Sequence, residues 1–140
     1  MKPSPDFPQP ETWHLHRVYY GETDAMGVVY YANYLDWFEI ARNSHLHAQG
    51  FSYAQIEAKG IFLPVREVQC RYYSPAKFDQ LIYLRTAIFE WRRASFVFGY
   101  EVTDEAKTIL LAKGTTWHAC VDQTGKPVPV PKWLRSLFDH

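Results

Sequence analysis

The sequence has few cysteines, no excess charge of either sign and no long apolar run. Its two cysteines, Cys70 and Cys120, lie far apart without CxxC spacing, so neither a cysteine metal ribbon nor a redox pair is indicated. Fifteen basic residues balance fifteen acidic ones, which argues against a general electrostatic grip on nucleic acid or anionic membrane. No apolar run approaches the ~20 residues needed to cross a bilayer. We therefore expect a cytoplasmic protein with no metal site, no nucleic-acid partner and no membrane insertion.

The N-terminal stretch lacks the apolar core of a signal peptide and is rich in proline instead, at positions 3, 5, 8 and 10. We expect residues 1–12 to form a mobile or loosely docked arm. Residues 13–140 fit one domain, because a chain of this length buries about 70% of its unfolded surface without disulfide or metal staples. Aromatic residues make up 17% of the chain, which predicts a substantial core or an aromatic-rich interface.

The apolar pattern predicts one long helix followed by long antiparallel strands. A first strand is expected over Trp13 to Tyr20, and residues from about Ala32 to Ala48 follow a helical period that Gly50 is placed to stop. Four extended segments come later, joined by short connections: Phe62 to Tyr73, Gln80 to Trp91, Ser95 to Thr103 and Thr108 to Val121. The second and third of these show an apolar period of two. Short helices are expected around Tyr53 to Lys59 and over Lys132 to Phe138. The order is typical of an α+β fold in which one sheet covers one central helix.

Asp24 lies in a short loop between the first expected strand and the long helix. A helix N-terminus offers unpaired backbone N–H groups and a partial positive charge of roughly half a unit, which can hold a developing oxyanion. A carboxylate beside it can attack a carbonyl or activate water to do so. No GxSxG nucleophile motif is present in the sequence. The segment therefore predicts a compact acyl-transfer site, although Asp with Gly27 three residues later is also ordinary turn chemistry.

Three segments of the sequence resemble hotdog-fold acyl-CoA thioesterases of the 4-hydroxybenzoyl-CoA thioesterase type, including the branch associated with the Tol-Pal system. They are Arg17-Val18-Tyr19-Tyr20 with Glu22-Thr23-Asp24-Ala25-x-Gly27-Val28-Val29-Tyr30-Tyr31-Ala32-Asn33-Tyr34, then Tyr72-x-x-Pro75-Ala76-x-Phe78-Asp79, and Glu90-Trp91-Arg92-Arg93-Ala94-Ser95-Phe96. The resemblance covers about residues 13 to 134 and implies a five-stranded antiparallel sheet wrapped around a long central helix. Many Tol-Pal-associated members carry His where this chain has Tyr31, which puts the substrate in doubt more than the reaction.

The resemblance also implies a reaction, namely hydrolysis of an acyl-CoA to the free acid and coenzyme A. Asp24 would be the catalytic carboxylate, and the backbone N–H of Tyr31 would face the thioester carbonyl. Whether Asp24 acts as nucleophile or as general base stays open, as does the acyl group, aromatic or short aliphatic. No cofactor is expected beyond the coenzyme A carried by the substrate. Alternatives are hydrolysis of thioesters on acyl carrier protein and a non-catalytic acyl-thioester-binding or scaffold protein.

Substrate contacts are expected in two places. The Asp24 segment would supply Gly27, Val28, Tyr30 and Asn33, although Tyr30 is also read as an ordinary aromatic and Asn33 as a helix cap or loop-fixing residue. Arg92 and Arg93, at an expected hairpin tip, would contact coenzyme A phosphates; a solvated turn is the alternative. The resemblance implies a homodimer or homotetramer with the acyl-CoA tunnel between subunits. An open-edged curled sheet favours such pairing.

Overall fold

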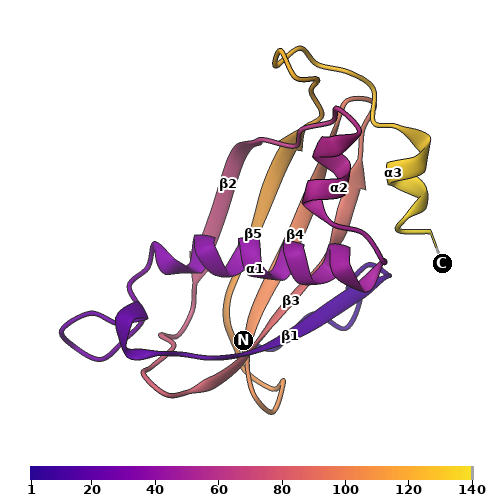
Figure 1. Cartoon of the computed structure of the whole chain (residues 1–140). Coiled ribbons are helices and arrows are strands. Elements are labelled where there is room, and N and C mark those ends of the chain that lie inside the picture. Colours follow the sequence, from indigo (N-terminus) through magenta and orange to yellow (C-terminus); the bar gives the residue numbers. More distant parts are fainter. Residues whose placement is uncertain (140) are drawn as a thin grey trace.

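The computed structural model describes residues 1–139, and residue 140, the last residue of the expected domain, lies outside this range. Five strands and three helices follow one another along the chain (Figure 1). In order they are β1 (Glu11–Arg17), α1 (Asn33–Ala48), α2 (Tyr53–Ala58), β2 (Val65–Tyr72), β3 (Leu81–Trp91), β4 (Ser95–Asp104), β5 (Leu110–Ala119) and α3 (Lys132–Ser136). A short 3-10 turn, Tyr20–Glu22, lies between β1 and α1.

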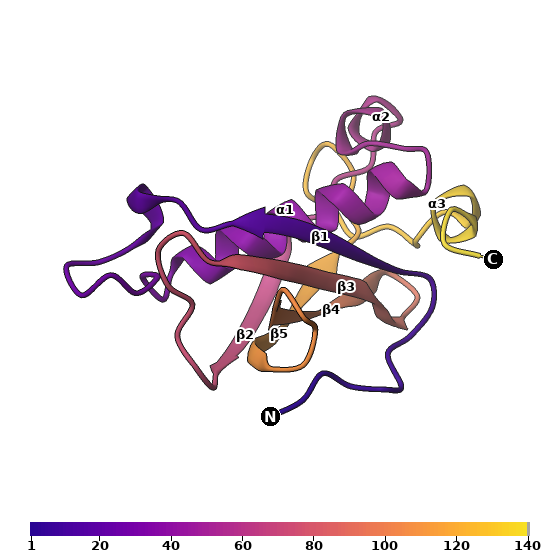
Figure 2. The ribbon, with the colours of Figure 1, turned by 90° about the horizontal axis from the view of Figure 1, so that it is seen from below.

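The strands form one antiparallel sheet in the order β1-β3-β4-β5-β2, and α1 lies across one face of it (Figures 1 and 2). This is the expected α+β hotdog arrangement, with a five-stranded sheet around a long central helix. The bounds of α1 and of β2 to β5 agree with the sequence pattern to within three residues. The strands alternate their side chains between two faces, so one face can be apolar along its whole length.

The core lies between α1 and the sheet. Phe96, Phe98 and Tyr100 of β4 point toward the helix and are buried, as the period of two predicts. From the helix side Trp37 and Phe38 are almost completely buried, and the ring of Phe38 stacks on that of Tyr100 at 4.2 Å between centroids. Burying side chains of this size contributes roughly 2 to 3 kcal/mol each, so this layer supplies much of the folding free energy.

Two glycines are required by the backbone or by the packing of α1. Gly50 follows the helix with φ of +81°, a left-handed conformation that ends helices and that glycine adopts without strain. Gly114 of β5 lies directly beneath the ring of Phe38, where an added Cβ would overlap both that ring and the backbone carbonyl of Gln69. The first fixes where α1 stops and the second lets α1 approach the sheet.

A chain of hydrogen bonds crosses this apolar core from α1 to β5. Arg42 donates from Nη1 to the hydroxyl of Tyr100 (3.1 Å), which bonds Thr116 Oγ1 (2.5 Å), which in turn bonds His118 Nε2 (2.8 Å). The other ring nitrogen of His118 lies 3.0 Å from the carbonyl oxygen of Leu63. Nδ1 must donate to that carbonyl, because a carbonyl oxygen only accepts. In the neutral imidazole Nε2 then accepts from the Thr116 hydroxyl. Burial is the main reason why the pKa of His118 falls to about 4.

The two ends of the first strand differ from expectation. β1 begins at Glu11, inside the expected arm, and ends at Arg17 rather than at Tyr20. Beyond Val18, which still donates to Gln80 O, the backbone turns so that Glu22 N–H donates to Tyr19 O. The expectation that the strand continues to Tyr20 was therefore wrong, because local turn bonds replace the ladder there.

The N-terminal segment packs on the face of the sheet opposite to α1 (Figure 2). The backbone N–H of Ser4 lies 3.0 Å from Glu101 Oε2, and its carbonyl accepts from Arg85 Nη1 at 2.8 Å. The ring of Phe7 is buried, with the Arg85 guanidinium 4.0 Å above it. Arg85 also bonds Glu11 and Glu101 at 2.6 and 2.7 Å. A buried arginine with two carboxylates thus holds the backbone of the segment in place.

Candidate active site

Asp24 lies in a small hairpin that projects from the body of the molecule, seen as the thin loop at the lower left of Figure 1. The hairpin is closed by a bridge between Thr23 and Val29 and by hydrogen bonds from Asp24 N–H to Val28 O (2.9 Å) and from Gly27 N–H to Asp24 O (3.1 Å). Gly27 has φ of +76°, a conformation that side chains disfavour, which explains the glycine three residues after Asp24.

The Asp24 carboxylate is exposed and only half engaged. Its Oδ1 accepts from the backbone N–H of Met26 at 2.8 Å, a turn contact that fixes the orientation of the side chain. Among residues 1–139 no donor bonds Oδ2. The ordinary turn role and an available carboxylate oxygen therefore coexist in one residue.

The start of α1 leaves backbone donors unused. The helix begins at Asn33 with Ala32 as N-cap, and no side chain caps it. The N–H groups of Tyr31 and Ala32 donate to no acceptor within the described part of the chain. The peptide that carries the Tyr31 N–H is held from its other side, because Tyr30 O accepts from Asn33 N–H at 2.9 Å. An oriented donor with the positive end of a helix behind it suits a developing oxyanion.

Glu22 is the buried carboxylate that organises this region, and it was missed from the sequence. It is 5% exposed and accepts hydrogen bonds from Trp37 Nε1 (2.6 Å), His16 Nε2 (2.9 Å) and the Tyr19 backbone N–H (3.1 Å). Glu39 on α1 is exposed, by contrast. The sequence does hold one signal for Glu22, namely an acidic residue close to several aromatic ones. A carboxylate buried among aromatic rings needs several hydrogen-bond donors.

The remaining residues predicted in the Asp24 segment have structural contacts of their own. Asn33 does not cap α1; its Nδ2 donates to Glu22 O at 2.8 Å, so it is the loop-fixing residue of the two alternatives. The ring of Tyr30 is half exposed beside that of Tyr31, with 4.7 Å between centroids. Val28 pairs with Lys77, which ties the hairpin to the connection before β3. All of these residues lie at the start of α1, and their contact with a substrate stays a prediction.

Arg92 and Arg93 lie at the other end of the molecule, at the tip of the β3–β4 hairpin. The Asp24 hairpin is next to the start of β3, and the eleven residues of that strand span about 35 Å. Arg92 forms an exposed ion pair with Glu90 (3.0 Å) and lies 4.3 Å above the ring of Trp117. One chain therefore does not bring these arginines to Asp24.

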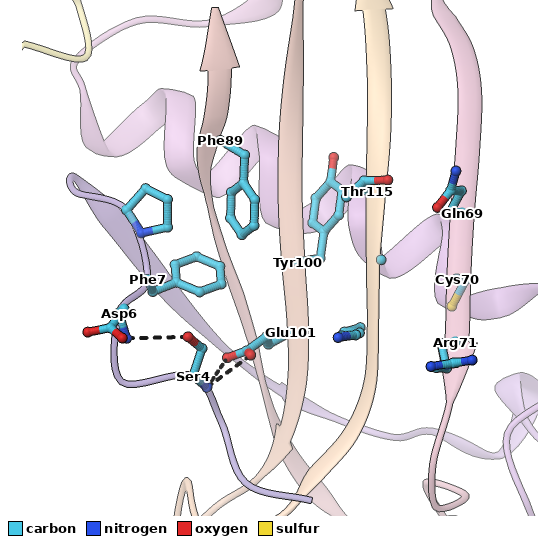
Figure 3. Close-up of a pocket in the computed structure, with 13 residues that line it drawn as sticks. Ser4, Asp6, Phe7, Gln69, Cys70, Arg71, Phe89, Tyr100, Glu101 and Thr115 are labelled. Carbon is cyan, nitrogen blue, oxygen red and sulfur yellow. Dashed lines mark hydrogen bonds between the residues drawn. The ribbon is translucent and has the colours of Figure 1, made fainter.

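A cavity lies on the outer face of the sheet, away from Asp24 (Figure 3). Its volume is about 770 Å³. Phe7 and Phe89 form one side and Gln69 and Arg71 of β2 the other, with Glu101 toward its lower end. None of the residues predicted for catalysis or substrate binding lines it. This cavity is therefore separate from the residues predicted for the reaction.

Residues 1–139 lack two features that would indicate metal binding or a membrane span. No group of three or more His, Cys, Asp or Glu side chains in this range is arranged to hold a metal ion. None of the helices there has both the length and the apolar character needed to cross a membrane.

Comparison with known proteins places this geometry in a family. The family model described as the thioesterase-like superfamily matches residues 18–138. The chain belongs to the thioesterase-like superfamily. Membership confirms the resemblance inferred from the Asp24 segment, and with it the prediction of an enzyme of the thioesterase class.

Curated relatives and a solved structure agree with the family assignment. The chain is 37% identical over 123 residues to the acyl-CoA thioester hydrolase YbgC of Escherichia coli O6:H1, covering 87% of this chain and 91% of that protein. It is 35% identical over 116 residues to the putative acyl-CoA thioesterase YneP of Bacillus subtilis, covering 82% and 83%. A DHNA-CoA thioesterase from Staphylococcus aureus superposes with a TM-score of 0.82 at 31% identity, over 90% of this chain and 85% of that one. The hotdog fold of this superfamily member is thereby confirmed.

Proposed function

We propose that this protein hydrolyses an acyl-CoA to the free acid and coenzyme A at the start of α1. The observation that carries the proposal is the pairing, on one short ribbon, of a carboxylate with an unbonded oxygen and a backbone N–H without an acceptor among residues 1–139. The acyl-CoA substrates in the names of the relatives YbgC and YneP support the same substrate class. The proposal needs no cofactor, because coenzyme A arrives as part of the substrate.

In the proposed reaction the thioester carbonyl oxygen accepts a hydrogen bond from the Tyr31 N–H, and Asp24 acts on the carbonyl carbon. As nucleophile, Asp24 Oδ2 forms a mixed anhydride while the carbon–sulfur bond breaks and coenzyme A leaves as thiolate; water then cleaves the anhydride. As general base, Asp24 takes a proton from water, which attacks in its place. A single turnover in ¹⁸O-water can identify the nucleophilic route, because anhydride cleavage at the aspartyl carbon leaves one labelled oxygen on Asp24, whereas general-base catalysis leaves none there.

The proposed active form is a homodimer or a homotetramer. Large apolar side chains around the Asp24 hairpin lack cover, with Tyr20, Met26, Tyr31 and Phe78 each more than half exposed. β2 is an edge of the sheet and pairs with β5 alone. Exposed apolar groups and an open edge of this kind favour a second chain, which would turn the surface around Asp24 into a cleft. It would also give Arg92 and Arg93 a route to the coenzyme A phosphates.

The experiment is a substrate panel followed by release of free thiol. Purified protein is incubated with aromatic acyl-CoAs, short and long aliphatic acyl-CoAs, and the same acyl groups on acyl carrier protein. Turnover of at least one acyl-CoA is expected. A clear preference for carrier-bound substrates would replace coenzyme A by acyl carrier protein. Saturable binding with no turnover of any substrate would contradict hydrolysis and favour an acyl-thioester-binding protein.

A further inference from the structure

We propose that Glu22 is the positioning residue of this site, holding the Asp24 hairpin and the Tyr31 N–H in a fixed relation to α1. This inference rests on the proposed function, because it assigns a role in the same reaction. Glu22 lies two positions before Asp24, and none of its atoms has to touch the substrate. Its contacts join β1, the base of the Asp24 hairpin and α1.

The backbone of Glu22 closes the base of the hairpin. Its carbonyl oxygen accepts from the N–H of Tyr30 at 3.0 Å and from Asn33 Nδ2 at 2.8 Å. The first contact holds the residue directly before Tyr31, and the second holds the first residue of α1. One carbonyl therefore links the 3-10 turn that leads into Asp24 with the backbone that leads out to the proposed oxyanion donor.

The side chain of Glu22 fixes that backbone to the body of the protein. Oε2 accepts from Trp37 Nε1 at 2.6 Å, and Trp37 is completely buried on α1. Oε1 accepts from the Tyr19 N–H at 3.1 Å and lies 2.9 Å from His16 Nε2 on β1. Since a carboxylate only accepts, His16 must carry a proton on Nε2. A buried charge is costly unless every contact is made, so this arrangement tolerates little displacement.

The tip of the hairpin is exposed from Asp24 to Gly27, and its outer strand is held to the connection before β3. There Val29 N–H donates to Ala76 O (2.8 Å), and Phe78 N–H donates to Gly27 O (3.1 Å). The hydrogen bonds from the base of the hairpin to α1 are made by Glu22, which accepts from Asn33 Nδ2 and Trp37 Nε1. Because a misplacement of about 1 Å at a reacting centre can cost on the order of 10² in rate, an anchor that never meets the substrate can still control turnover.

The test compares Glu22→Gln with a variant that disturbs α1 elsewhere. Glutamine keeps the size of the side chain but replaces one acceptor oxygen by a donor, which then faces either the Tyr19 N–H or the Trp37 Nε1–H unfavourably. We expect kcat to fall roughly 10- to 100-fold, with KM within about threefold. The control is Thr12→Val, which removes the 2.6 Å contact between Thr12 Oγ1 and His45 Nδ1 near the other end of α1. It should lower the melting temperature while kcat stays within twofold.

Hydrogen exchange gives a second readout that does not depend on turnover. In Glu22→Gln the amides of residues 23–33 should exchange at least tenfold faster than in the unaltered protein, while those of β3 and β4 should be unchanged. Thr12→Val should leave residues 23–33 as they were. Unchanged exchange in Glu22→Gln would overturn the inference, and so would unchanged kcat. Faster exchange throughout the chain would also overturn it, because Glu22 would then support general stability.

The two proposals fail in different ways. If the unaltered protein hydrolyses no acyl-CoA, the proposed function fails, and the exchange experiment still decides whether Glu22 orders the ribbon. If the unaltered protein is active and Glu22→Gln matches it in kcat and exchange, the proposed function stands and the role of Glu22 does not.

Discussion

The two ends of α1 are built in opposite ways. At its C-terminal end the short helices α2 and α3 bury Leu46, Ile56, Leu134 and Phe138 in an apolar cluster. At its N-terminal end the chain leaves a carboxylate, backbone donors and aromatic rings exposed around a buried charged anchor. The C-terminal, closed end therefore stabilises the fold by burying apolar side chains. The N-terminal, open end leaves polar groups and aromatic rings exposed.

The largest change in folding stability should come from the closed end. Leu134 is 1% exposed, so Leu134→Ala leaves a cavity and should lower the free energy of unfolding by about 3 kcal/mol. Chemical denaturation followed by tryptophan fluorescence measures the change. Activity at 25 °C should stay within twofold. A large loss of kcat in the still folded variant would break the division between the two ends.

Leu15→Ala is the matched control for that leucine. Leu15 is 47% exposed on β1, so the same truncation leaves no cavity. The expected loss is below about 0.5 kcal/mol. A similar loss in both variants would show that the apolar cluster is not where the stability of this region resides.

Stability should also fall in acid because His118 is buried in its neutral form. Burial lowers the pKa of His118 from 6.5 to about 4, helped by the nearby positive charge of Arg42 and opposed by the bond to Leu63 O. In the unfolded chain the imidazole becomes protonated as the pH falls below about 6.5. In the folded protein it stays neutral until about pH 4. The contribution is therefore present above pH 6.5 and is lost as pH falls toward 4, by on the order of 3 kcal/mol.

Urea unfolding at pH 7 and at pH 4.5 checks this prediction. His118→Gln removes the titrating ring, so its stability should change less between the two pH values than that of the unaltered protein. An equal pH dependence in the variant would assign the acid sensitivity to other groups. Carboxylates such as Glu11 would then be the next to examine, since hydrogen bonds from Arg85 and Trp13 outweigh the opposing effect of burial and lower the pKa of Glu11.

A modest effect on turnover is expected from a hydroxyl at the open end. The Tyr72 hydroxyl donates to Tyr31 O at 2.9 Å and so supports the backbone beside the proposed oxyanion donor. Tyr72→Phe removes one hydrogen bond worth about 1 kcal/mol and should lower kcat about fivefold with KM nearly unchanged. Steady-state thiol release measures both constants. An unchanged kcat would show that the start of α1 is rigid without this contact.

The closed end and the sheet could be predicted from sequence because local patterns determine them. Alternating apolar residues such as Ile82 and Leu84 identify a strand face without knowledge of its neighbours, and Gly50 marks the end of a helix by its own conformational preference. Glu22 could not be assigned in this way, because its donors come from His16 on one side and from Trp37, fifteen residues further along, on the other. Such contacts depend on three-dimensional placement.

The candidate site shows the same division. Asp24 and the helix start were predicted together because they are neighbours in sequence, and their family segment matches. Arg92 and Arg93 were grouped with them by resemblance alone, and the length of β3 separates them within one chain. The hydrogen bonds by which Arg85 and Glu101 hold the backbone of the N-terminal segment could not be predicted either, because neither follows a local sequence pattern.

The most direct test of the central claim compares the unaltered protein with Asp24→Asn in thiol release at saturating acyl-CoA. Asparagine keeps the acceptor for the Met26 N–H, so the fold and KM should be retained, but it cannot attack a carbonyl or take a proton at neutral pH. We expect kcat to fall by about 10² to 10⁴. A folded variant that is as active as the unaltered protein would contradict catalysis by Asp24.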